Sequence, residues 1–224
     1  MSASLPADIK SLQVDVISDV VCPWCYVGKR QLEDALDRWG AAHPDAPTPI
    51  VTWHPFQLNP DMPAEGMLRD HYLRRKFGSG DVSKIYTHVQ RAAEQVGLEL
   101  NLEAIVRQPS TLRPHSLLQQ AAEQGNQESV AEALFTAYFI DGRDLSDSES
   151  LRDIGLTAGL TPDRVDMALN DPQWHDAIAR ADTQARENGV SGVPFFIFNG
   201  KLAVSGAAGA DTLVEAMEKA VSRV

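Results

Sequence analysis

The only cysteines of the 224-residue chain are Cys22 and Cys25, and Pro23 and Trp24 separate them. Two cysteines at this spacing can bind a metal, pack together as small apolar side chains, or exchange disulfides with a partner. Each of these uses requires a different protein around the pair. The spacing therefore constrains the fold more than any other feature of the sequence does.

A metal site at the cysteine pair is disfavoured by the positions of the histidines. Structural zinc takes four ligands, usually two cysteine pairs or one cysteine pair with two closely spaced histidines. The histidines stand at positions 43, 54, 71, 88, 115 and 175, and no two of them form such a pair. We therefore expect no metal, and we favour thiol–disulfide exchange over an inert buried pair.

The sequence around the pair predicts different roles for the two thiols. Residues 12–17 have strand character, and residues 23–39 have helical spacing with proline at a favoured first position. Cys22 then lies at the helix N-terminus, where free N–H groups and the helix dipole stabilise a thiolate. Cys25 lies one turn inside and can attack the mixed disulfide formed by Cys22. We expect Cys22 to be the nucleophile and Cys25 the resolving thiol.

The residues between and around the cysteines also suggest a redox potential. Pro23 fixes the first helical turn, and Trp24 adds bulk without positive charge. Strong oxidants of this kind stabilise the thiolate much further than a helix terminus alone can. We therefore expect a potential closer to that of a reductase or an isomerase.

The order of predicted elements gives the domain organisation. A strand at 12–17, a helix at 23–39 and a strand at 50–56 predict a right-handed crossover unit. Helical patterns follow at 67–77, 82–96, 114–124, 129–140, 149–158 and 162–169, with no strand signal stronger than the short LEL at 98–100. After a helix at 174–187, FFIF and KLAVSG flank Asn-Gly, the strongest short signal for a hairpin, and a last helix spans 211–221.

This order predicts an α/β domain formed by residues 1–62 and 171–224. An all-helical insertion at residues 63–170 interrupts it, and we expect the insertion to form a lid or a wall over one face. Two adjacent domains without functional contact are the alternative.

Val193 and Pro194 precede the strand-like FFIF sequence. Proline at the start of a strand is ordinary. Beside a redox-active cysteine pair, a cis Val193–Pro194 bond would leave the Val193 backbone free to pair with an extended substrate, and cis bonds occur mainly before proline. The expected substrate-binding residues are therefore Pro23, Trp24, Val193 and Pro194.

Charge and hydropathy exclude several classes of partner. The formal net charge is −11, which argues against binding to nucleic acid or anionic lipid, because both need clustered cations. No apolar run approaches the ~18 residues of a membrane span. The opening MSASLPADIK lacks a secretory signal. We expect a cytoplasmic protein, in a compartment that keeps thiols reduced.

Together these segments resemble the thioredoxin-like disulfide oxidoreductases of the DsbA type. CPWC opens a helix after a strand, a helical insertion follows, and GVP enters a hairpin before the last helix. SDVVCPWCYVGKRQLEDAL, WHPFQLNPDMP, EALFTAYF and GVSGVPFFIFNGKLAVSGA are similar to the FrnE-like branch of that group. The resemblance covers nearly the whole chain. It implies a thioredoxin-like fold, with Cys22 attacking, Cys25 resolving and Pro194 as the cis proline that faces them.

Three further residues stand at positions where the DsbA-type proteins carry characteristic side chains. Asp15, on the first strand, resembles the buried acid that relays the proton of the resolving cysteine in many thioredoxin-like proteins. A partly solvated position is the alternative, because a shift of one residue moves a strand side chain to the other face. His54 stands where the group has Arg, and His115 lies where an Asn-Thr start is typical. We expect both histidines to be ordinary surface or pocket residues.

The leading functional hypothesis is a dithiol–disulfide oxidoreductase that acts on protein or small-molecule disulfides without a tightly bound cofactor. Glutathione, as a co-substrate, or a thioredoxin system would donate electrons. The alternative is a glutathione-dependent transferase or isomerase of the kappa or 2-hydroxychromene-2-carboxylate isomerase type, with an anion site at SGAAGAD (205–211). The third hypothesis is a non-catalytic chaperone that binds peptides at the Val193 edge.

Overall fold

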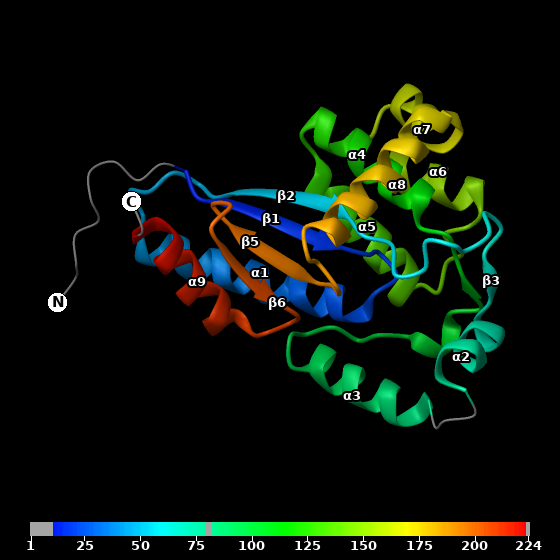
Figure 1. The fold of residues 1–224 in the computed structure, drawn as a ribbon, viewed down its shortest axis with the longest axis horizontal. Helices are drawn as coiled ribbons and strands as arrows, with labels where there is room; N and C mark the ends of the chain where they lie inside the picture. The colour runs from blue at the N-terminus through cyan, green and yellow to red at the C-terminus, as the bar shows by residue number, and fades with distance from the viewer. Residues whose placement is uncertain (1–10, 79–81, 223–224) are drawn as a thin grey trace.

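The computed structural model describes residues 11–78 and 82–222, and a four-stranded mixed sheet lies at its centre (Figure 1). The strand order is β2-β1-β5-β6. β1 (Gln13–Ser18) pairs in parallel with β2 (Ile50–Pro55) and antiparallel with β5 (Phe195–Phe198). β6 (Leu202–Ser205) pairs antiparallel with β5 at the edge. The parallel β1–β2 pair is the predicted crossover unit.

Helices cover both faces of this sheet. α1 (Pro23–Ala42) and α9 (Ala210–Ser222) pack together on one face, and α8 (Pro172–Glu187) lies on the other (Figure 1). The α/β class with a helical insertion is confirmed.

The alternation of side chains along β1 sends its residues to different helices, because strand side chains have a period of two. Val14 and Val16 are buried in the main core, together with residues of α1 and α9. Ile17 faces the other way and packs with Phe56 and Val190 in a smaller cluster under α8. This alternation decides which residues of β1 can reach the cysteines.

The segment between β2 and α8 is mainly helical. Its helices are α2 (Arg69–Phe77), α3 (Val82–Glu94), α4 (Leu112–Gln124), α5 (Gln127–Phe139), α6 (Ser148–Thr157) and α7 (Pro162–Asn170). α4 to α7 pack against one another, and α3 runs beside α1 (Figure 1). Their buried side chains and those of the sheet form one continuous core. The division at residues 62/63 and 170/171 stays a prediction.

The hairpin between β5 and β6 is confirmed at its predicted Asn-Gly turn. Asn199 and Gly200 have φ angles of 52° and 65°. Positive φ at both central residues is what a two-residue hairpin turn of the favoured kind requires, and Asn and Gly tolerate it best.

Two short elements differ from the sequence-based prediction. Met67 and Leu68 were expected to begin a helix, but they form β3 (Met67–Leu68), which pairs antiparallel with β4 (Arg107–Gln108). The LEL sequence at 98–100 is not a strand in the structure. A two-residue strand depends on a partner forty residues away, so no local pattern reveals it.

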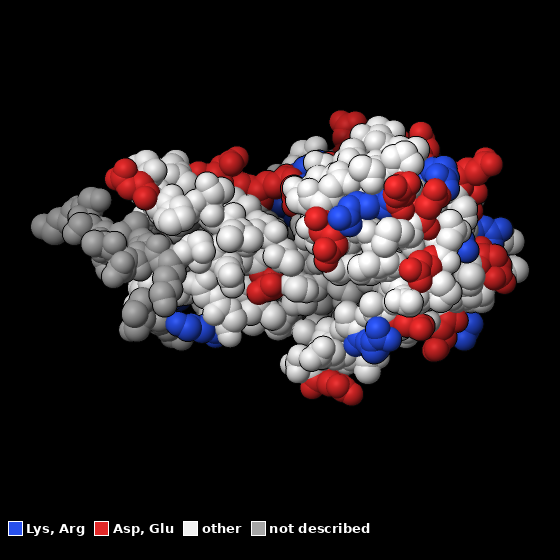
Figure 2. Space-filling view, turned by 90° about the horizontal axis from the view of Figure 1, so that it is seen from above, with Lys and Arg blue, Asp and Glu red and all other residues white. Residues whose placement is uncertain are grey.

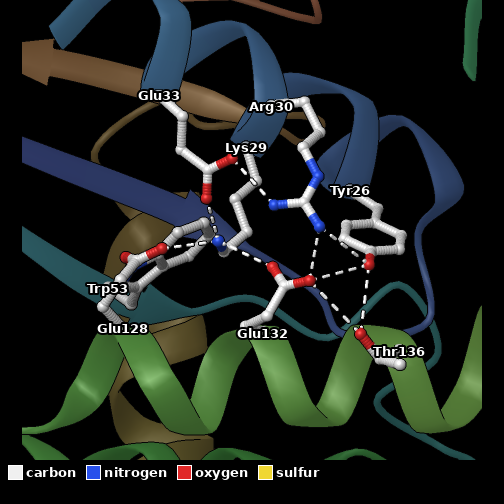
Figure 3. Close-up of polar contacts among 8 residues, drawn as sticks. All are labelled: Tyr26, Lys29, Arg30, Glu33, Trp53, Glu128, Glu132 and Thr136. Carbon is white, nitrogen blue, oxygen red and sulfur yellow. Dashed lines mark hydrogen bonds and ion pairs between the residues drawn. The ribbon is translucent and has the colours of Figure 1, made fainter. Parts of the chain in front are cut away.

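An ion cluster around the buried Lys29 side chain joins α1 to α5 (Figure 3). The Lys29 side chain is 2% exposed, and its ammonium contacts Glu33, Glu128 at 2.6 Å and Glu132 at 2.8 Å. Burial disfavours the ammonium charge, but the surrounding carboxylates raise the pKa of Lys29 above its usual value. Arg30 also pairs with Glu33 and Glu132. The helix that carries the cysteines is thereby fixed to the helical segment.

The outer surface has mixed charge on the face seen in Figure 2, where acidic and basic side chains are scattered without a continuous basic area. In the described ranges, no helix combines the length and the apolar character needed to cross a membrane.

Candidate active site

Cys22 is the N-cap residue of α1, and Pro23 takes the first helical position. The Cys22 backbone is extended, with φ −96° and ψ 112°. The Cys25 N–H donates to the Cys22 carbonyl oxygen at 3.0 Å, so Cys25 lies one turn inside the helix. The two cysteines are free thiols 3.5 Å apart. This arrangement allows a disulfide to form without moving the helix.

The two thiols differ in exposure, and burial affects the inner one strongly. Cys22 is 5% exposed and Cys25 is 1% exposed. Burial and the hydrogen bond with Cys22 raise the pKa of Cys25 well above its usual value, while the Ser18 hydroxyl and the Asp19 backbone oppose this shift. Cys25 is therefore held protonated behind Cys22 until a donor group stabilises its thiolate.

The Val193–Pro194 peptide bond is cis, and it lies opposite the cysteines. The Cys22 Sγ is 3.7 Å from the Val193 carbonyl oxygen, and the Gly206 N–H donates to the Pro194 carbonyl oxygen at 2.8 Å. Within the described part of the chain, no group accepts a hydrogen bond from the Val193 amide. That amide is available to an extended ligand beside Cys22.

Trp24 and Pro23, the residues between the cysteines, are both half-buried. The Trp24 ring contacts the ring of His88 on α3, with 5.2 Å between ring centroids. His88 is exposed. The helical segment thus brings an imidazole to the redox motif, a contact between residues 64 positions apart that the sequence does not signal.

The structure places Asp15 away from the cysteines, in the partly solvated position that was weighed against the proton-relay role. Asp15 alternates with Val14 and Val16 on β1 and therefore faces α8, on the opposite side of the sheet from α1. Its carboxylate contacts His54 Nε2 at 2.7 Å, and both side chains are partly exposed. His54 is thus a surface residue, as expected, and its polar partner is Asp15.

A different carboxylate, Asp19, lies beneath the redox motif. It is fully buried, and its oxygens accept hydrogen bonds from the Leu58 N–H at 2.7 Å and the Val21 N–H at 3.5 Å. His115 Nε2 lies 3.5 Å from Asp19 Oδ1 and 3.2 Å from the Phe56 carbonyl oxygen. His115 is therefore buried in the pocket beneath the motif, one of the two ordinary positions expected for it.

The loop at 56–58 is fixed by a second buried carboxylate as well. The Gln57 N–H donates to Asp182 of α8 at 2.8 Å, and Arg186 lies over the Phe56 ring at 4.1 Å. No local pattern in the sequence indicates Asp19 and Asp182, because their partners Leu58 and Gln57 are distant in the chain. The SDVVCPWC segment does place Ser18 and Asp19 directly before the motif.

The sequence predicts no metal site at the cysteine pair. Across residues 11–78 and 82–222, no group of three or more His, Cys, Asp or Glu side chains is arranged to hold a metal ion.

Comparison with known proteins assigns the family. The chain matches the model of the DSBA-like thioredoxin domain over residues 13–218. It therefore belongs to the DSBA-like thioredoxin domain family, a family of thiol–disulfide oxidoreductases with a thioredoxin-like fold. The chain is also 28% identical to YwbO, an uncharacterized protein of Bacillus subtilis strain 168, over 216 residues that cover 95% of this chain and 96% of that protein.

Solved structures agree with this assignment. A probable DsbA oxidoreductase from Streptomyces coelicolor superposes with a TM-score of 0.83 at 28% identity, covering 95% of this chain and 91% of that chain. A 2-hydroxychromene-2-carboxylate isomerase has a TM-score of 0.65 at 16% identity, over 92% and 95% of the two chains. The cytosolic disulfide reductase DsbM from Pseudomonas aeruginosa with GSH has a TM-score of 0.62 at 15% identity, over 94% and 96%. The last two show a shared fold.

Proposed function

We propose that this protein is a thiol–disulfide oxidoreductase of the FrnE-like type that reduces disulfides of proteins or small molecules. The Cys22 thiolate attacks one sulfur of the substrate disulfide, forms a mixed disulfide and releases the other sulfur as a thiolate. The Cys25 thiol then gives its proton to the released substrate thiolate and attacks the Cys22 sulfur, forming the Cys22–Cys25 disulfide and releasing the second substrate sulfur as a thiolate. Two electrons pass to the substrate, and an external thiol must return the pair to its reduced form.

One observation carries the proposal. Cys22 stands at the N-terminus of α1 beside the Val193 carbonyl, and Cys25 lies 3.5 Å behind it with less exposure, so the outer sulfur meets a substrate first and the inner one can resolve the mixed disulfide. The free Val193 amide supports a peptide-like substrate that pairs beside Cys22. Pro23, Trp24 and Pro194 complete the proposed contact surface.

The proposed electron donors are glutathione, as a co-substrate without tight binding, or a thioredoxin system. The structure of DsbM with GSH supports glutathione at the level of the fold. A cytoplasmic location is part of the proposal, because a reductase must find a supply of reducing thiols.

The isomerase-like fold neighbour gives the alternative function, a glutathione-dependent transferase or isomerase. Its anion site would use the N-terminus of α9. There the Gly209 N–H already donates to Gln31 Oε1 at 3.1 Å, and the Asp211 carboxylate in the first turn pairs with Arg38 at 2.7 Å. A carboxylate at this position disfavours a second anion. The contacts therefore support the oxidoreductase over the transferase.

The test is reduction of insulin disulfides, run once with glutathione and once with a thioredoxin-reducing system. We expect activity in the natural chain and none in Cys22→Ser. Glutathione-dependent isomerisation or transfer that survives in Cys22→Ser would instead support the alternative. Suppression of aggregation that needs neither cysteine would support the chaperone hypothesis.

A further inference from the structure

The last turn of α2 concentrates positive charge in a chain whose net charge is −11. Arg74, Arg75 and Lys76 are consecutive and exposed. Neither arginine contacts a carboxylate of the described residues, and the Lys76 ammonium donates to the Tyr72 hydroxyl at 2.7 Å. Many other cations are ion-paired, including Lys29, Arg30, Arg38, Arg107, Arg143, Arg152, Arg186 and Lys219. The last turn of α2 therefore carries positive charges that no nearby carboxylate of the described residues neutralises.

Exposed apolar side chains accompany these cations. Leu68 is 51% exposed, Val106 is 65% exposed and Phe77 is 37% exposed. The Arg69 N–H donates to the Val106 carbonyl oxygen at 3.0 Å, which places Val106 beside the start of α2. Here "the α2 surface" means the set Leu68, Arg74, Arg75, Lys76, Phe77 and Val106. Its combination of cations and exposed apolar groups is typical of a protein contact.

A pocket of about 330 Å³ lies between α2 and the loop after β2. Arg75 and Lys76 line one side, and Met62 and Leu58 line the other, while Asp61 contributes the one carboxylate of its lining. The lining is therefore apolar with a net positive charge.

Leu58 connects this pocket to the redox site. The Leu58 N–H donates to Asp19 Oδ2 at 2.7 Å. Asp19 precedes Cys22 by three residues in the chain. Leu58 and Val193 both pack against the small cluster that contains Phe56. Leu58 therefore belongs both to the pocket lining and to the packing around Val193, which brings the pocket close to the segment that faces Cys22.

We propose that the α2 surface and its pocket bind an acidic, partly apolar polypeptide segment next to the disulfide of a protein substrate. The inference rests on the proposed function and adds the substrate class. Acidic side chains complement the unpaired cations, and apolar side chains complement Leu68 and Val106. A small anionic thiol would fill the pocket but would leave the exposed apolar groups uncovered, so the occupant is a polypeptide.

The test measures binding separately from redox chemistry. The full-length Cys22→Ser protein is titrated into two fluorescein-labelled peptides of equal length at low salt, one alternating Glu with Leu and one alternating Lys with Leu. We expect the acidic peptide to bind about tenfold more tightly, as a few exposed charges together can produce. Added salt should shrink this difference, because it screens exposed charges.

Two triple variants, each changing the net charge equally, locate the effect. Arg74→Gln/Arg75→Gln/Lys76→Gln should abolish the preference for the acidic peptide. Arg180→Gln/Lys201→Gln/Lys219→Gln, which alters exposed cations elsewhere, should preserve it. Circular dichroism verifies that both variants fold.

Three results would overturn the inference: equal binding of both peptides, equal behaviour of the two triple variants, or displacement of the acidic peptide by glutathione disulfide at equal concentration. The last result would assign the pocket to a small thiol. None of these bears on insulin reduction, which tests the proposed function by itself.

Discussion

Gly28 lies directly beneath Pro194, and a β-carbon at position 28 would come within 2.9 Å of the Pro194 Cγ. The same atom would be 3.2 Å from Phe196 Cζ. Gly28 is in the interior of α1, three residues after Cys25. The helix that carries both thiols can therefore approach the cis proline because this position has no side chain.

Gly28→Ala should destabilise the protein by about 1–2 kcal/mol, since overlap with the proline outweighs the gain in helix propensity. It should also slow disulfide reduction, because Pro194 must shift. Gly40→Ala is the matched control in the same helix, with no atom within 4 Å of the added carbon. The control should stabilise the protein by about 0.5–1 kcal/mol in urea unfolding. Equal stabilisation by both changes would contradict the close contact.

Replacing Asp19 should lower the free energy of unfolding much more than replacing Asp15. Asp19→Ala leaves the buried Leu58 and Val21 amides unpaired and should cost about 2–4 kcal/mol of the free energy of unfolding. Asp15→Ala removes a partly exposed contact with His54 and should cost less than about 1 kcal/mol. Urea unfolding measures both. Asp15→Asn should also leave the rate of mixed-disulfide resolution unchanged, and a slowed rate would restore Asp15 as the proton relay.

The contrast between these two carboxylates shows where sequence information ends. The strand before the motif was predicted from its β-branched residues, and the start of α1 from the favoured position of proline, because both signals are local. The face of β1 that Asp15 occupies depends on the register with its neighbours, which no local pattern contains. Asp19 was passed over for a related reason, since its partner Leu58 is 39 residues away.

The same limit applies to the helical segment. Its helices were predicted from their spacing, yet the contact of His88 with Trp24 and the burial of His115 depend on how those helices pack. Lys29 carries no signal in the sequence, although three carboxylates from two helices surround it in the structure. The fold class was therefore predictable, while most supporting residues of the site required the structure.

Lys29→Met should destabilise the protein by about 2–4 kcal/mol, because it leaves several carboxylates facing one another without their shared cation. The value is below that of a fully buried pair, since the glutamates are partly exposed. Lys219→Met, which removes an exposed pair with Glu215, is the control and should change the free energy by less than about 0.5 kcal/mol. Comparable losses in urea unfolding would rule out a stabilising role for the cluster.

Glu132 should make stability depend on pH in the acid range. Burial disfavours its charge, but hydrogen bonds from Lys29 and Arg30 outweigh this and lower its pKa below the usual 4.5. The folded state then binds fewer protons than the unfolded state, so Glu132 stabilises the protein above its unfolded pKa and loses this effect as pH falls through the folded pKa. The stability difference between the natural chain and Glu132→Gln should be constant near neutrality and should shrink below about pH 4.5. An unchanged difference down to pH 3 would contradict this.

The most direct test of the central claim is to trap the mixed disulfide. Cys25→Ser cannot complete the second step, so on incubation with a disulfide-bonded peptide it should accumulate a covalent adduct at Cys22, which intact-mass and peptide mass spectrometry can locate. Cys22→Ser should form no adduct under the same conditions, because Cys25 is buried and its pKa is raised. An adduct at Cys25 in Cys22→Ser, or none at Cys22 in Cys25→Ser, would contradict the assignment of Cys22 as the attacking thiol.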